Sequence, residues 1–437
     1  MNTLFKKIIL LMFLFLVSPI YASDDLTIHI TKGASKPYPI AILSFSADGK
    51  INQQTAGVIT KDLQYSARFL FINENKPSQY KDTSVATLDW QAWRNKKVDY
   101  LVFGRVEKQS TGNYKIFVNV ASVFGKKSLL HLEYKDVLLA DLKVVSHKIS
   151  DAIYKVITGM PGYFTTHIAY VLIKKITDTR IKYSLVVSDV DGSNAHEVFS
   201  TVNRPIASPM WSPDGKRLAY VSYVKHSMAI YMYDLVTKHH HILAHFSGIN
   251  SAPVWSHNGR YMALALSMGS SFKTNLYVLD IKQSKLAQVT HTGVNTSPTW
   301  SFDDKKMAFT SNRGGSPQIY EMFWQSPGEI KRLSYMGVRN FHPLYIRHSH
   351  KLVVISQLES DGPLRIGVLD PISGDVDVIT HGKLDKSPSV SPNGYMIIYA
   401  NYDKKNGILE EVSSDGQINI KLPSAFGTVQ SPAWSPH

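Results

Sequence analysis

The sequence predicts an α+β multidomain protein, in which a small N-terminal α/β domain precedes a six-bladed β-propeller closed by strand exchange between its ends. Three observations predict this fold: an apolar N-terminal stretch, alternating strand and helix patterns after it, and a repeat of 44 or 45 residues over the remainder. With 44% hydrophobic and 19% charged residues, the chain is not intrinsically disordered. It has no cysteine, which excludes disulfides, thiolate metal sites and cysteine nucleophiles.

Residues 1–22 have the pattern of a signal peptide. Two lysines precede an apolar run from Ile8 to Val17, and small residues lead up to Ser23. The alternative, a membrane anchor, needs about 20 consecutive apolar residues, and Pro19 ends this run earlier. We therefore expect export to the periplasm with cleavage before Ser23, and no stable membrane insertion.

The formal net charge is +14, and the basic residues are spread along the chain. A nucleic-acid binder gathers lysine and arginine on one stripe or arm. The sequence therefore predicts no nucleic-acid partner, but a diffuse attraction to acidic partners.

Residues 23–160 are expected to form the α/β domain. The predicted strands cover residues 27–30, 40–45, 100–106, 114–122 and 130–137, and the predicted helices cover residues 55–69, a short stretch from residue 90, and 139–158. Gly159 and Pro161 end the last helix. Since no phosphate-binding glycine motif opens a helix, no nucleotide cofactor is expected.

Residues 163–437 contain the repeat. Six strings of the type S-P-x-W-S-P-D-G begin at Ser208, Ala252, Ser297, His342, Ser387 and Ser431. We call these strings the anchors. Each is followed by alternating apolar runs and turns that suit four short strands, which is typical of a propeller blade. The anchor tryptophans Trp211, Trp255, Trp300 and Trp434 are expected to pack between blades rather than to react.

The sixth anchor has no strands after it, whereas residues 167–200 match the later strands of a unit that lacks its anchor. The strand from Pro432 to Ser435 is therefore expected to complete a blade begun near Tyr163. Closing the ring in this way removes exposed sheet edges.

The whole mature chain resembles the TolB family, periplasmic proteins of the Tol-Pal system of Gram-negative bacteria. The resemblance rests on the anchors and on the strings D-W-Q-A-W-R from Asp89, I-A-Y-V from Ile168, S-D-V-D-G from Ser188 and the ending from Ser431. The chain departs from the pattern at Tyr345, at His348 to His350 and at Val390. These departures put the local packing of the fourth and fifth repeat units in doubt, but not the closed ring of six blades.

The resemblance implies a non-enzymatic scaffold that supports outer-membrane integrity and envelope constriction during cell division. It implies binding of the peptidoglycan-associated lipoprotein Pal through a propeller face and of TolA through a mobile N-terminal segment, with other outer-membrane proteins as further candidates. The segment is Ser23, Asp24, Asp25, Leu26, Thr27, Ile28, His29, Ile30, Thr31, Lys32 and Gly33. Its β-prone residues suit addition to a partner's sheet, but an edge strand of the α/β domain is the alternative.

If the strands run outward from the channel, the residues before each anchor proline lie nearest the pore. We therefore place the Pal site on Ala207, Ser208, Ser251, Ala252, Thr296, Ser297, Phe341, His342, Lys386, Ser387, Gln430 and Ser431. Most are small and are expected to leave the mouth open, although small residues also let strands crowd at an axis. The Asp214–Gly215 and Asn393–Gly394 turns are expected on the opposite face.

Other functions have less support. The sequence contains no G-x-S-x-G elbow, the motif that would indicate a serine hydrolase. His239 to His241 lack the spacing of a zinc site. Asp189 to Gly192 resembles part of a calcium loop but suits a hairpin turn. No cofactor or metal is therefore assigned, although a cation held by carboxylates in the channel stays open. The alternative function is binding of a small molecule or sugar in the central channel.

Overall fold

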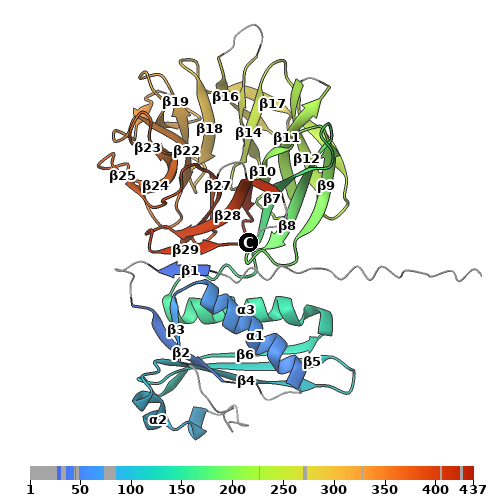
Figure 1. Cartoon of the computed structure of the whole chain (residues 1–437), viewed down its shortest axis with the longest axis vertical. Coiled ribbons are helices and arrows are strands. Elements are labelled where there is room, and N and C mark those ends of the chain that lie inside the picture. The colour runs from blue at the N-terminus through green and yellow to red at the C-terminus, as the bar shows by residue number, and fades with distance from the viewer. Residues whose placement is uncertain are drawn as a thin grey trace, which may run out of the picture.

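The computed structural model describes residues 27–30, 36–43, 45, 49–72, 85–225, 227–268, 273–326, 328–403, 406–423 and 427–437. The predicted signal peptide, and residues 23–26 and 31–33 of the predicted TolA segment, lie outside these ranges. The α/β domain and the propeller follow one another along the chain (Figure 1).

The α/β domain is a mixed five-stranded sheet with two long helices on one face (Figure 1). Its elements are β2 (Tyr38–Ile42), α1 (Gly49–Tyr65), β3 (Phe69–Phe71), α2 (Trp90–Asn95), β4 (Tyr100–Lys108), β5 (Tyr114–Ser122), β6 (Lys127–Val137) and α3 (Leu142–Thr158). The strand order is β3-β2-β4-β5-β6, and β2 runs parallel to both of its neighbours.

The boundaries of this domain follow from local sequence. The buried residues Val145, Ile149 and Ile153 recur on one face of α3, and the left-handed Gly159 ends the helix by donating its N–H to Lys155 O. The predicted helix over residues 55–69 instead spans Gly49–Tyr65, because the chain turns and then enters β3, a strand that the sequence analysis missed.

Six sheets make the propeller ring. In order from the anchor strand outward they are β30-β7-β8-β9, β10-β11-β12-β13, β14-β15-β16-β17, β18-β19-β20-β21, β22-β23-β24-β25 and β26-β27-β28-β29. We number them blades 1 to 6. Their strands are β7 (His167–Lys175), β8 (Ile181–Asp189), β9 (His196–Val202), β10 (Ala207–Trp211), β11 (Arg217–Val224), β12 (Ser227–Asp234), β13 (His240–Ala244), β14 (Asn250–Trp255), β15 (Tyr261–Leu266), β16 (Asn275–Asp280), β17 (Lys285–Gln288), β18 (Asn295–Trp300), β19 (Lys306–Ser311), β20 (Gln318–Phe323), β21 (Lys331–Arg332), β22 (Arg339–Tyr345), β23 (Leu352–Gln357), β24 (Arg365–Leu369), β25 (Val376–Val378), β26 (Asp385–Val390), β27 (Met396–Asp403), β28 (Asn406–Ser413), β29 (Ile418–Lys421) and β30 (Thr428–Trp434).

Blade 1 is built from both ends of the propeller sequence. β30 pairs antiparallel with β7, with Ala433 opposite Ala169 and Trp434 opposite Ile168. This is the pairing that the sixth anchor predicts. Trp434 is buried, and its indole N–H donates to Thr166 Oγ1 at 2.7 Å.

Every anchor strand carries a β-bulge. In β10, Ser208 and Pro209 together stand opposite the single residue Tyr220, and each of the other anchors shows the same register shift. Proline lacks an N–H for the ladder and is tolerated at a bulge. The residue before each anchor proline has a positive φ, between 48° and 54°, at Ser208, Ala252, Ser297, His342, Ser387 and Ser431.

The N-terminal strand β1 (Thr27–Ile30) joins blade 6. It pairs antiparallel with β29, with Ile28 opposite Ile420, so blade 6 has five strands. Figure 1 shows β1 between β29 and the α/β domain. The described part of the predicted TolA segment is therefore neither free nor an edge strand of the α/β sheet, because the outer edge of blade 6 supplies its backbone partners.

Candidate functional site

The antiparallel blades give the propeller two faces. The loops that precede each anchor and those between the second and third strands lie on one face, which we call the loop face. The turns after each anchor and those between the third and fourth strands lie on the other, the turn face. Each anchor strand contacts the anchors of the neighbouring blades, so the anchors form the innermost ring. Each blade extends outward strand by strand, which corrects the expectation that the strands themselves run outward.

The α/β domain contacts the turn face. Lys143 Nζ on α3 lies 2.6 Å from Asp189 Oδ2 in blade 1, and Tyr65 Oη donates to Val190 O at 3.1 Å. In blade 6, Asn393 Nδ2 donates to Pro161 O at 2.8 Å. These contacts cover part of the turn face and leave the loop face to solvent or partners.

The residues predicted to bind Pal meet at the loop-face end of the anchors. Ser208 and Lys386 are exposed, and the others are partly buried: Ala207, Ser251, Ala252, Thr296, Ser297, Phe341, His342, Ser387, Gln430 and Ser431. The small residues before the prolines occupy the left-handed bulge position, where a large side chain has no advantage. The bulge alone therefore explains why these residues are small, and their size is no evidence for an open channel mouth.

His342 breaks the run of small residues. Its backbone N–H donates to Thr310 Oγ1 at 3.0 Å, which ties this bulge to blade 4. Desolvation by the surrounding protein lowers the pKa of His342 to about 4, so the imidazole is neutral at pH 7.

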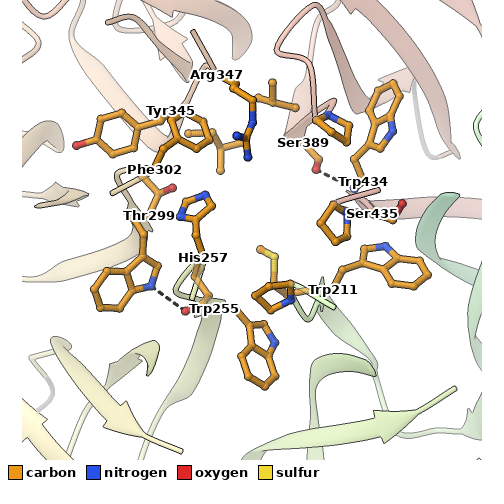
Figure 2. Close-up of a pocket in the computed structure, with 18 of the residues that line it drawn as sticks. Trp211, Trp255, His257, Thr299, Phe302, Tyr345, Arg347, Ser389, Trp434 and Ser435 are labelled. Atoms are coloured by element: carbon orange, nitrogen blue, oxygen red, sulfur yellow. Dashed lines mark hydrogen bonds between the residues drawn. The ribbon is translucent and has the colours of Figure 1, made fainter. Parts of the chain in front are cut away.

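A cavity of about 350 Å³ lies at the turn-face end of the channel (Figure 2). Anchor residues such as Trp211, Trp255 and Tyr345 line it. Its rim contains the residue four positions after each anchor proline: Pro213, His257, Phe302, Arg347, Pro392 and Pro436. Three neighbouring blades thus contribute prolines to the rim, and the other three contribute His257, Phe302 and Arg347, which we call the His-Phe-Arg arc.

The His-Phe-Arg arc is stacked. The ring of His257 lies 5.0 Å from that of Phe302, and the Arg347 guanidinium carbon lies 4.7 Å from the Phe302 ring centre. His257 is held by Asp304, whose carboxylate accepts both its backbone and its ring N–H. In Figure 2 the guanidinium and imidazole groups point toward the middle of the cavity. The sequence signal for this arc was the loss of proline at three equivalent positions.

A buried carboxyl group lies near the contact between the domains. Glu411 on β28 is fully buried, and burial raises its pKa to about 8, with the negative charge of Asp191 acting in the same direction. Glu411 is therefore mostly protonated at neutral pH. No sequence pattern indicates this group, because its burial depends on how the α/β domain packs against blades 1 and 6.

Two motifs that resemble metal sites in sequence make other contacts in the structure. The rings of His239 and His241 lie 6.1 Å apart beside each other, as strand alternation predicts. Asp189 accepts hydrogen bonds from Lys143 and Asn194. Within the described ranges, no group of three or more His, Asp or Glu side chains is placed to hold a metal ion, and no helix is long and apolar enough to cross a membrane.

A six-bladed propeller with an α/β domain seated on one face defines a multidomain β-propeller protein. Two family models match the sequence. The model of the TolB amino-terminal domain matches residues 26–129, and the model of the TolB beta propeller domain matches residues 154–437. The chain belongs to the TolB family, non-enzymatic scaffold proteins of the Tol-Pal system of the cell envelope.

Relatives match over their full length. The chain is 33% identical to the Tol-Pal system protein TolB of Francisella tularensis subsp. holarctica, over 99% of both chains, and 36% identical to that of Nitrosococcus oceani, over 100% of both. The crystal structure of TolB from Acinetobacter baumannii is similar, with a TM-score of 0.83 and 31% identity, covering 94% of this chain and 100% of that one.

Proposed function

We propose that this protein is a periplasmic scaffold that binds Pal through the loop face of the propeller and TolA through residues 23–33. In this role it supports outer-membrane integrity and envelope constriction during division. The observation that carries the proposal is the use of the two faces: the α/β domain contacts the turn face, whereas the loop face stays exposed.

Exposed apolar side chains on the loop face support this role. They are Ile176, Ile249, Met268, Val294, Tyr335, Met336 and Leu358, on loops that precede an anchor or join second to third strands, and Val202 at the end of β9; the turn face carries fewer, namely Val236, Phe302, Phe323 and Ile372. Apolar side chains that gather on one surface are typical of a protein interface.

Titration calorimetry with purified Pal tests the face. Thr296→Arg and Ala252→Glu put bulky charges at the loop-face end of the anchors, and we expect each to weaken Pal binding at least about tenfold by clash and desolvation. Val236→Arg is the matched control, because Val236 is highly exposed on a turn-face loop of blade 2. If the loop-face variants bind Pal normally and the control loses Pal binding, the Pal site lies on the turn face and the proposal is wrong.

Asn393 is a wrong control for that experiment. The sequence predicts it on the face opposite the Pal site, where the structure has it, but it is buried and its side chain bonds to Pro161 O, Ser391 and Tyr395. A charged residue there would disturb the domain contact rather than leave the protein unchanged.

For TolA, the structure adds a constraint to the proposal. One edge of β1 is paired with β29, so TolA either adds to its other edge or displaces it from blade 6. A protein shortened to start at Pro37 removes the segment, and we expect it to fold and to lose TolA binding in a pull-down. If it binds TolA as tightly as the mature chain, the segment is not the TolA site.

The turn-face cavity favours a second candidate function, binding of a small molecule in the channel. Its size is at the lower end of ligand pockets, and Arg347 offers a guanidinium held over Phe302. A thermal-shift screen against periplasmic metabolites tests this candidate. A hit that Arg347→Gln abolishes would support it, and the lack of any stabilising compound would contradict it.

A further inference from the structure

Exposed charges on the described loop-face segments are mostly basic, with Asp178, Glu359 and Asp361 as the exposed acids among them. The basic side chains on loop-face segments include Lys174, Arg180, Arg204, Lys225, Arg339, Lys383 and Lys386, and all of these are exposed. Among the residues that the structure describes, no carboxylate lies within 4.0 Å of their charged nitrogens. Lys175 beside them does have an acidic partner, Asp178 at 2.5 Å.

The turn face carries charges of both signs: some of its basic side chains are paired, whereas Lys216, Lys238 and Lys282 are exposed with no carboxylate within 4.0 Å among the described residues. Ion pairs there include Arg217–Asp214, Arg260–Asp280 and Lys351–Asp370, with nitrogen–oxygen distances of 3.2, 2.9 and 3.9 Å, and the pair of Lys143 on α3 with Asp189 at 2.6 Å. The two faces therefore differ in their balance of charges, because the turn face also carries the exposed acids Asp214, Asp303, Asp375 and Asp415, although the basic residues are spread evenly along the sequence.

The position of the free charges matters as well as their sign. Arg204 and Lys383 lie on segments that cross from the outermost strand of one blade to the anchor of the next, and Arg339 begins the anchor strand β22, so all three lie beside the channel mouth. The exposed apolar residues Val202, Tyr335 and Met336 lie on the same segments. Arginine and aromatic side chains beside apolar ones are typical of the centre of a protein interface.

We infer that the loop face binds its protein partner through an acidic surface on that partner. This deepens the proposed function and rests on it, since the partner proposed for this face is Pal. An acidic protein fits better than an anionic membrane, because the charges ring an opening on separate loops and no described helix on this face offers an amphipathic surface.

An acidic partner would be attracted over a distance and would bind faster at low ionic strength. Screening shortens this attraction from about 10 Å at 0.1 M salt to about 3 Å at 1 M. Steering of this kind acts mainly on the association rate. Charge removal on the loop face should therefore lower that rate and its salt dependence together.

The experiment compares two double variants of the full mature chain. Arg339→Glu with Lys383→Glu reverses two loop-face charges. Lys216→Glu with Lys282→Glu is the matched control, because both residues are exposed on turn-face turns and the net charge changes equally. Binding is measured to Pal, to poly-L-glutamate and to phosphatidylglycerol vesicles, at about 50 mM and about 500 mM salt.

We expect the loop-face variant to bind Pal about tenfold more slowly at low salt and to lose poly-L-glutamate binding, while the control stays within about twofold of wild type. Equal behaviour of the two variants toward poly-L-glutamate would overturn the inference, and so would vesicle binding through Arg339 and Lys383 without poly-L-glutamate binding. Salt-independent Pal binding would overturn it but leave the proposed function standing. Poly-L-glutamate binding through these residues without any Pal binding would contradict the proposed function alone.

Discussion

The turn face and the loop face are built from the same repeat but are used differently. On the turn face, Lys143, Tyr65 and Pro161 of the N-terminal part contact blades 1 and 6. On the loop face, Arg204 and Tyr335 stay exposed. One side of a symmetric ring thus contributes to the protein's own stability, and the other is left for partners. Substitutions on the turn face should therefore change stability, and substitutions on the loop face should change binding.

The largest expected effect comes from the turn-face end of β30. Trp434→Ala removes a buried indole that packs on Tyr163 with ring centres 5.8 Å apart and donates to Thr166. We expect a loss of about 3 to 5 kcal/mol in the free energy of unfolding, measured by urea denaturation. Removing residues 432–437 should cost at least as much, and an unchanged midpoint for that truncation would show that β30 does not hold blade 1 together.

Asn393→Arg should follow, with a loss of about 2 to 4 kcal/mol. The substitution leaves Pro161 O without its donor and forces a cation into a buried turn. Thr296→Arg on the loop face is the comparison, and it should change the free energy of unfolding by less than about 1 kcal/mol. Equal losses in the two variants would contradict the division of roles between the faces.

Glu411→Gln should make stability less dependent on pH. The pKa of Glu411 is raised to about 8 in the folded chain, whereas an unfolded glutamate titrates near about 4.3. The stability linked to this proton is full below the unfolded pKa and is lost as the pH rises through about 8. The variant should therefore gain thermal stability over wild type as the pH is raised from about 5 to about 8. An identical pH profile would show that Glu411 is ionised in the fold.

The smallest effects are expected for the two surface ion pairs, and of these Asp189→Asn should cost more. Lys143 is partly exposed, with 35% of its side chain accessible against 16% for Asp189, so solvent weakens the pair. We expect a loss of about 1 kcal/mol, which should shrink in high salt because screening already weakens the pair. Asp178→Asn on the loop face removes the more exposed pair with Lys175 and should cost less. A larger loss for Asp178→Asn would reverse the comparison.

Most of the ring could be predicted from sequence because each blade repeats the same local signals. The anchor tryptophans Trp211, Trp255 and Trp300 are buried between blades as predicted, with Trp211 and Trp300 bonding to the backbone of the preceding anchor. Tyr345 replaces tryptophan without breaking the ring, since its hydroxyl donates to Glu321 at 2.7 Å and β22 still pairs with β23.

What sequence reasoning missed depends on contacts between distant segments. The docking of β1 on β29 needs the last blade to be present, and the burial of Glu411 needs the domain contact. The bulge before each anchor proline was also missed, although proline after a small residue within a strand is a usable signal. The residues proposed to bind Pal and TolA stay predictions that only binding measurements can test.

The joining of β30 to β7 has a consequence for how the chain folds. His167 and Ser435, 268 positions apart, are hydrogen-bonded across this joint, so blade 1 cannot form until nearly the whole propeller sequence is available. Bringing such distant segments together costs loop entropy before any contact repays it, and it slows folding. β1 depends on late structure too, because its partner β29 belongs to blade 6. Blade 1 and the N-terminal strand are therefore expected to be among the last parts of the molecule to become ordered.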